Sequence, residues 1–176
     1  MIEIENYNFP LGDDSIKNLE KQRGIILPKD YKEFLSKYNG GTPKYMNTFR
    51  LMDSNNDSDS NIDNFLGIDH PCETLSMRYI FEFFGTRVPK PLLPIARDPF
   101  GNLICICTQG DNYGKVYFWD HEDEGMDNNE PWWKNIYLIA NSFIEFMNGL
   151  FEFDIDDEGN KIYKFQDGTV KKIPKK

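Results

Sequence analysis

The sequence has few of the residues that carry most catalytic and metal chemistry. It contains three cysteines and two histidines among 176 residues, and it has no CxxC, HExxH or GxSxG motif. Cys105 and Cys107 alternate in the run LICICT, which places both on one face of a predicted strand, as small apolar core residues. We therefore expect no catalytic residue, no metal site and no cofactor, and we predict that the chain is not an enzyme.

His121 leaves one catalytic alternative open. It stands between Asp120 and Glu122, an arrangement that would allow a proton relay. No motif, however, places a serine or cysteine nucleophile beside it. The simpler interpretation is that His121 ends a strand and contributes hydrogen bonds.

Long apolar runs and a basic leader are also missing. No stretch approaches the roughly 20 apolar residues of a transmembrane helix, and residues 1–9 include Glu3 and Glu5 but lack the basic segment of a signal peptide. An odd number of cysteines in a chain of this size does not indicate a disulfide framework. These features predict a cytoplasmic protein without membrane contact.

The charge balance excludes one class of partner and favours another. The chain has 29 acidic and 20 basic residues, a formal net charge of −9 and a pI of about 4.7. Such a chain repels phosphates, so we expect no binding to nucleic acid or to an anionic membrane. A basic protein partner fits the charge, although the charge could serve only to keep the protein soluble.

The clearest local pattern is LPKDYKEFLSKYNGG, from Leu27 to Gly41. Its apolar residues recur at i, i+3, i+4 and i+7, which predicts one buried stripe on a helix. Proline suits the first turn of that helix, and the closing Asn-Gly-Gly can adopt the positive φ that ends it. The stripe consists of Tyr31, Phe34, Leu35 and Tyr38.

Other segments predict a mixture of helices and antiparallel strands. Three short apolar runs joined by turns indicate a meander, and a capping box of Ser142 and Glu145 begins a C-terminal helix. The predicted helices are Ser15–Arg23, a largely buried Thr74–Phe84, and Phe143–Leu150. The predicted strands are Thr48–Met52, Leu92–Ala96, Leu103–Thr108, Lys115–Trp119 and Ile136–Ile139.

Two polar loops and a tail complete the chain. Residues 53–61 (DSNNDSDSN) and the acidic stretch 120–130 are expected to be exposed loops. The first contains half of a calcium-binding pattern, but Ser58 stands where that pattern needs glycine. In the tail, Lys161–Phe165 and Thr169–Ile173 flank an Asp-Gly turn and predict a hairpin. We expect one domain, formed by residues 1–150 with residues 151–176 appended.

Five motifs occur in the order found in one known family. Besides LPKDYKEFLSKYNGG, they are FLGI at 65–68, LPIARD with GN at 93–102, KVYFWDH at 115–121 and IANSF to Leu150 at 139–150. Together they resemble the SUKH superfamily, which includes the fungal SMI/KNR cell-wall assembly regulators and many bacterial immunity proteins. The motif residues concerned are Leu27, Pro28, Tyr31, Phe34, Leu35, Tyr38, Gly40, Gly41, Asp98, Gly101, Asn102 and Trp119.

The resemblance implies both a fold and a function. The expected fold is α+β, with a twisted, mostly antiparallel sheet and helices packed against it. The expected function is that of an immunity protein, a monomer or weak dimer, which neutralises a basic toxin domain by occlusion; the alternative is a regulatory scaffold of the fungal type. An acidic face with a tryptophan anchor suits a basic toxin. The predicted contacts are Asp120, Glu122, Asp123, Glu124, Asp127, Glu130, Trp132 and Trp133, with Asp57 and Asp59 as a second choice.

Overall fold

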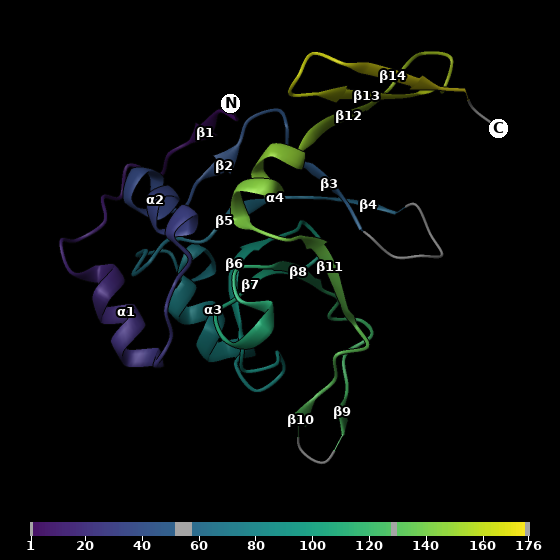
Figure 1. The fold of residues 1–176 in the computed structure, drawn as a ribbon. Coiled ribbons are helices and arrows are strands. Elements are labelled where there is room, and N and C mark those ends of the chain that lie inside the picture. The colour runs from purple at the N-terminus through teal and green to yellow at the C-terminus, as the bar shows by residue number, and fades with distance from the viewer. Residues whose placement is uncertain (1, 52–57, 128–129, 175–176) are drawn as a thin grey trace.

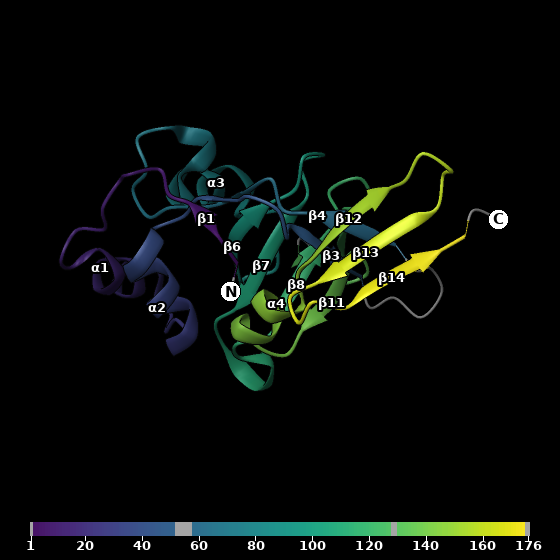
Figure 2. The ribbon, with the colours of Figure 1, turned by 90° about the horizontal axis from the view of Figure 1, so that it is seen from above.

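The computed structural model describes residues 2–51, 58–127 and 130–174. In these ranges the chain forms two five-stranded antiparallel sheets with four α-helices packed around them (Figures 1 and 2). The predicted α+β class with mostly antiparallel strands is therefore confirmed. Ten of the described strands divide between these two sheets and four form two-stranded pairs, whereas the sequence predicted one sheet with an appended hairpin.

The first sheet contains the predicted meander. Its strand order is β5–β6–β7–β8–β11, and each neighbouring pair is antiparallel. Every residue of β7 and β8 is buried, so both faces of these central strands are covered. The strands are β5 (Asn64–Phe65), β6 (Leu92–Arg97), β7 (Leu103–Cys107), β8 (Val116–Trp119) and β11 (Ile136–Ala140).

The second sheet joins the C-terminal tail to an earlier part of the chain. Its order is β14–β13–β12–β3–β4, and Phe151 of β12 pairs with Thr48 of β3. The predicted tail hairpin is confirmed as β13 and β14, which project from the body in Figure 1. Strand β12 was not predicted. The bounds are β3 (Thr48–Arg50), β4 (Asp59–Asn61), β12 (Phe151–Ile155), β13 (Lys161–Phe165) and β14 (Val170–Ile173).

Three of the helices match their predicted ranges closely. They are α1 (Ser15–Arg23), α2 (Lys29–Tyr38) and α4 (Phe143–Gly149). Gly24 ends α1 with a φ of 63°, and the Ser142 hydroxyl caps α4 by accepting from the Glu145 amide at 3.1 Å. Both signals are local, and this explains why the sequence predicted these boundaries.

Helix α3 (Met77–Phe84) corrects the prediction of a largely buried helix over residues 74–84. The Ser76 hydroxyl accepts from the Tyr79 amide and starts the helix at residue 77, after a short 3₁₀ turn. Only Met77 and Ile80 are buried, whereas Tyr79 and Phe83 are exposed. The apolar residues of this segment therefore cover both the core side and a solvent-facing side of one helix.

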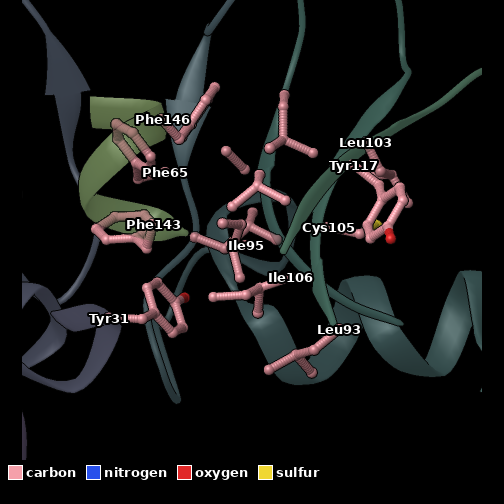
Figure 3. Close-up of a cluster of buried hydrophobic side chains, with 14 of the residues drawn as sticks. Tyr31, Phe65, Leu93, Ile95, Leu103, Cys105, Ile106, Tyr117, Phe143 and Phe146 are labelled. Atoms are coloured by element: carbon pink, nitrogen blue, oxygen red, sulfur yellow. The ribbon is translucent and has the colours of Figure 1, made fainter. Parts of the chain in front are cut away.

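The stripe of α2 forms the centre of the aromatic core. Tyr31 and Leu35 are fully buried, Phe34 is 7% exposed, and Tyr38 lies half-buried at the edge. The rings of Tyr31 and Phe34 lie 4.9 and 5.1 Å from that of Phe143 on α4. Figure 3 shows Tyr31 and Phe143 on one side of the first sheet. Pro28 precedes the first turn of α2 and is not part of it.

The glycines after α2 allow the chain to pass close to other backbone. Asn39, Gly40 and Gly41 all have positive φ, as predicted. A Cβ on Gly40 would lie 2.9 Å from the backbone of both Gly67 and Phe65, and one on Gly41 would lie 2.6 Å from the Glu5 carbonyl oxygen. Only glycine fits these two contacts, which seat the end of α2 against β5 and against the pair of β1 (Ile4–Glu5) and β2 (Thr42–Pro43).

Candidate partner-binding surface

The acidic stretch after β8 forms a hairpin in place of the predicted loop. Strands β9 (Met126–Asp127) and β10 (Glu130–Pro131) pair antiparallel, with Glu130 opposite Asp127. Figure 1 shows this hairpin extending beyond β8 and β11, at the end of the molecule opposite β13 and β14. The acids are therefore carried on a projecting arm, which we call the acidic hairpin (residues 120–127 and 130–133).

The six predicted acids of this hairpin differ in what they contact. Glu124 forms a bidentate pair with Arg87, at 2.6 and 2.7 Å, and Glu130 lies 3.8 Å from Lys90. Asp120 is half-buried and accepts a hydrogen bond from the Glu122 amide.

The remaining acids, Glu122, Asp123 and Asp127, are exposed. Among the described residues, none of these three has an ion-pair partner. The negative charge that a partner would meet is therefore concentrated on them.

Trp132 and Trp133 directly follow β10. They differ in exposure, as expected for adjacent side chains that point to opposite sides of an extended chain. Trp132 is half-buried, and its ring covers Gly125, where an added Cβ would lie 2.6 Å from the ring. Trp133 is 47% exposed and rests edge-on against Tyr117 of β8, with ring centres 6.2 Å apart. Trp133 thus places a large apolar surface beside the exposed acids, held by a strand of the first sheet.

The second predicted acidic segment offers less accessible charge. Asp57 lies outside the described residues. The prediction of an exposed loop is wrong for residues 59–61, because they form β4 and pair with β3. The Asp59 carboxylate is 18% exposed and lies 3.0 Å from the Arg50 guanidinium, so its charge is largely offset by a neighbour.

The turn after β6 is a structural junction. Asp98 is fully buried, and its carboxylate accepts from the amides of Phe100 and Asn102 at 2.9 and 2.8 Å. It also accepts from the Asn102 side chain at 2.8 Å and from the Ser60 hydroxyl at 3.1 Å. This carboxylate therefore ties β4 of the second sheet to the β6–β7 turn of the first.

His121 extends the same network. The Asn102 side-chain oxygen lies 2.7 Å from His121 Nδ1 and accepts from the His121 amide at 3.1 Å. Gly101, with a φ of 98°, lets the turn pass the imidazole. These contacts favour the interpretation that His121 ends a strand and contributes hydrogen bonds. Within the described residues, no group of three His, Cys, Asp or Glu side chains could hold a metal ion.

Trp119, the last of the motif residues, belongs to the core. Its side chain is fully buried, with its ring 5.5 Å from that of Phe84 on α3 and beneath the Arg87 guanidinium. Because Arg87 also holds Glu124, the base of the acidic hairpin is fixed to the core. In the described ranges, no helix is long and apolar enough to span a membrane.

Two comparisons with known proteins extend these observations. The model of the SMI1/KNR4 family (SUKH-1) matches residues 10–149, a range that includes all of the first sheet and helices α1 to α4. The SPbeta prophage-derived uncharacterized protein YokK of Bacillus subtilis (strain 168) is 32% identical over 170 residues. The match covers 84% of this chain and 80% of that relative.

Proposed function

Because the chain belongs to the SMI1/KNR4 family (SUKH-1), we propose that it is a non-catalytic immunity protein that neutralises a basic toxin domain. Inhibition is by occlusion, with the acidic hairpin placed over a basic cleft of the toxin. A nuclease is the toxin class that best fits, since its substrate phosphates require a basic cleft. The protein performs no chemical step in this scheme.

The observation that carries the proposal is the composition of the projecting acidic hairpin. Glu122, Asp123 and Asp127 are exposed there, close in sequence to Met126 and Trp133, which are 51% and 47% exposed. Unpaired acids steer a basic partner and can raise association rates toward about 10⁸–10⁹ M⁻¹s⁻¹ at low salt. Exposed aromatic residues at the centre of an interface supply much of its binding energy. The hairpin thus combines the two elements that fast, tight association needs.

Rigidity at the base of the hairpin supports the same function. The Arg87–Glu124 pair and the packing of Trp132 on Gly125 hold the arm in one orientation. A pre-organised arm loses less conformational entropy on binding than a mobile loop would. Glu124 therefore has a different role from its neighbours, because it positions the surface through Arg87.

Rescue of cells from a toxin is the first test. The chain is co-expressed with the C-terminal domain encoded by the neighbouring open reading frame, and colony formation is counted. We expect survival with this chain and death without it. If the neighbouring product is toxic and this chain gives no protection, the immunity function is wrong and the scaffold alternative gains support.

Charge reversal then tests the surface. Replacing Glu122, Asp123 and Asp127 by lysine should slow association with that toxin domain at least tenfold at low salt and flatten its salt dependence. The matched control reverses three exposed acids elsewhere on the surface: Asp13, Asp111 and Asp157. Each of the three reversals changes the charge by two units, so the two variants have the same net charge. Equal slowing in both would assign the effect to overall charge and refute the role of the hairpin.

A further inference from the structure

A recess outside the acidic hairpin lies between α3 and β6. Its volume is about 240 Å³, just below the roughly 300–1,000 Å³ of typical small-molecule pockets. Its apolar wall is formed by residues of α3, of β6 and of the segments beside them: Ile25, Phe81, Phe84, Val88, Leu92 and Leu93. The recess therefore suits a compact ligand with an apolar body.

One cation is fixed at the side of this recess. Arg23 is the last residue of α1, and its guanidinium carbon lies 3.8 Å from the centre of the Phe81 ring. The side chain is only 24% exposed, and its carboxylate neighbour among the described residues, Glu82, is 4.0 Å away and 65% exposed. Stacking on Phe81 orients the guanidinium plane and leaves the N–H groups on its edge available.

The Arg23 guanidinium has hydrogen-bond donors to spare. Among the described residues it makes no hydrogen bond with another side chain or carbonyl group, and its 4.0 Å contact with Glu82 is longer than a hydrogen bond. A half-buried guanidinium in this state gains from a ligand that accepts two hydrogen bonds in its plane, as a carboxylate does.

The rim of the recess adds a second cation and no acid. Lys90 is 85% exposed, and its contact with Glu130 at 3.8 Å is too exposed to hold it firmly. Gln109 is exposed at the same rim, whereas the Thr108 hydroxyl already donates to the Pro91 carbonyl group at 3.0 Å. None of the described residues that line the recess is acidic. In a chain of net charge −9, a lining whose charged groups are both cations, with their carboxylate neighbours Glu82 and Glu130 outside it, favours an anionic ligand.

We propose that this recess binds a small organic acid with an apolar body. The carboxylate lies on the edge of Arg23, within reach of Lys90, and the body packs against Phe84, Val88 and Leu93. The apolar wall disfavours inorganic phosphate, which would lose its hydration there without enough donors to replace it. The proposal does not depend on the toxin-binding function proposed above, and the recess meets the acidic hairpin through the contact of Lys90 with Glu130.

A pair of matched probes tests the proposal on the unmodified protein. 3-Phenylpropionate and its neutral amide, 3-phenylpropionamide, are titrated into labelled protein while amide chemical shifts are followed. We expect saturable shifts at the amides of Ile25, Val88 and Leu93, with the acid binding about tenfold more tightly than the amide. That ratio is the effect of one charge-assisted contact.

Substitution of the cation completes the test. Arg23→Gln should reduce the affinity for the acid about tenfold and leave the affinity for the amide unchanged. The control Arg78→Gln removes an arginine that pairs with Asp69 and does not line the recess, so both affinities should stay as they are.

Two results would overturn the proposal. The first is equal affinity for the acid and the amide in the unmodified protein. The second is the absence of saturable shifts at the recess up to about 10 mM of either probe. Both results are measured on the unmodified protein, so a folding defect in Arg23→Gln would not affect the test of the proposal.

Discussion

Replacing Tyr31 by phenylalanine should stabilise this protein. Tyr31 is fully buried on α2, and its ring packs edge-on against Phe143. Among the described residues, its hydroxyl group has no hydrogen-bond partner. Burial also holds the pKa of Tyr31 well above its usual range, as expected for a hydroxyl group without a polar neighbour.

The expected gain follows from the cost of that hydroxyl group. A buried polar group without a partner costs about 1–3 kcal/mol, whereas phenylalanine keeps the ring and its contacts. We expect the free energy of unfolding to rise by about 1 kcal/mol, which corresponds to roughly 2–4 °C in Tm for a chain of this length. Urea unfolding of both proteins measures the change, with equal m-values showing that the same surface is exposed.

A companion substitution separates the ring from the hydroxyl group. Tyr31→Ala removes both and should lower the free energy of unfolding by about 3–5 kcal/mol, the usual cost of removing a buried aromatic ring. If Tyr31→Phe instead lowers stability by about 1 kcal/mol or more, the hydroxyl group is hydrogen-bonded in the native protein and the reasoning fails. If Tyr31→Ala is neutral, the stripe of α2 does not face the core.

Three further predictions concern other parts of the structure. Asp98→Asn puts an amide donor among groups that already donate, so it should lower the free energy of unfolding, measured in urea, by about 2–3 kcal/mol. A neutral result would show that the hydrogen bonds of Asp98 do not stabilise the fold. In the tail, hydrogen bonds from Lys172 and Asn160 hold the pKa of Asp156 below its usual value. Their stabilising effect is complete above the ordinary carboxyl pKa of about 3.9 and is lost as the pH falls below it. The protection factors of the β13 and β14 amides, which correct for the intrinsic slowing of exchange in acid, should therefore fall at acid pH, and Asp156→Asn should remove that dependence. Finally, Cys72 is exposed and Thr74 lowers the pKa of its thiol, whereas Cys105 and Cys107 are buried. A thiol reagent should modify one cysteine in the native protein and three in urea, and a second fast thiol would contradict the packing of β7.

Features encoded by neighbouring residues could be predicted from the sequence. The stripe of α2 and the Ser142 cap of α4 each depend on residues within two helical turns. Strand β7 is buried on both faces, as a run such as LICIC without a polar residue favours. In each case the local pattern and the final packing agree, which is typical of a sequence that specifies one fold.

Features that depend on a distant partner were missed. Strand β4 consists only of the polar residues Asp59, Ser60 and Asn61, and it forms because β3 lies beside it. Strand β12 was missed although its sequence FEFDI alternates apolar and polar residues; its place between β13 and β3, where Phe151 pairs with Thr48, was not anticipated. Tertiary pairing therefore decides β4, whereas β12 also carries a local signal.

The same distinction decides which acids can act on a partner. By sequence, Glu122 and Glu124 are equivalent members of one acidic run, yet Arg87, 37 residues earlier, pairs with Glu124 alone. A paired carboxylate contributes little field to an approaching protein, whereas an unpaired one contributes its full charge. Arg87 also stacks on Trp119, so the pairing that neutralises Glu124 anchors the arm that carries Glu122. The contact between Arg87 and Glu124 therefore sets both which acids keep their charge and how the acidic hairpin is held. No local pattern in the acidic run encodes that contact.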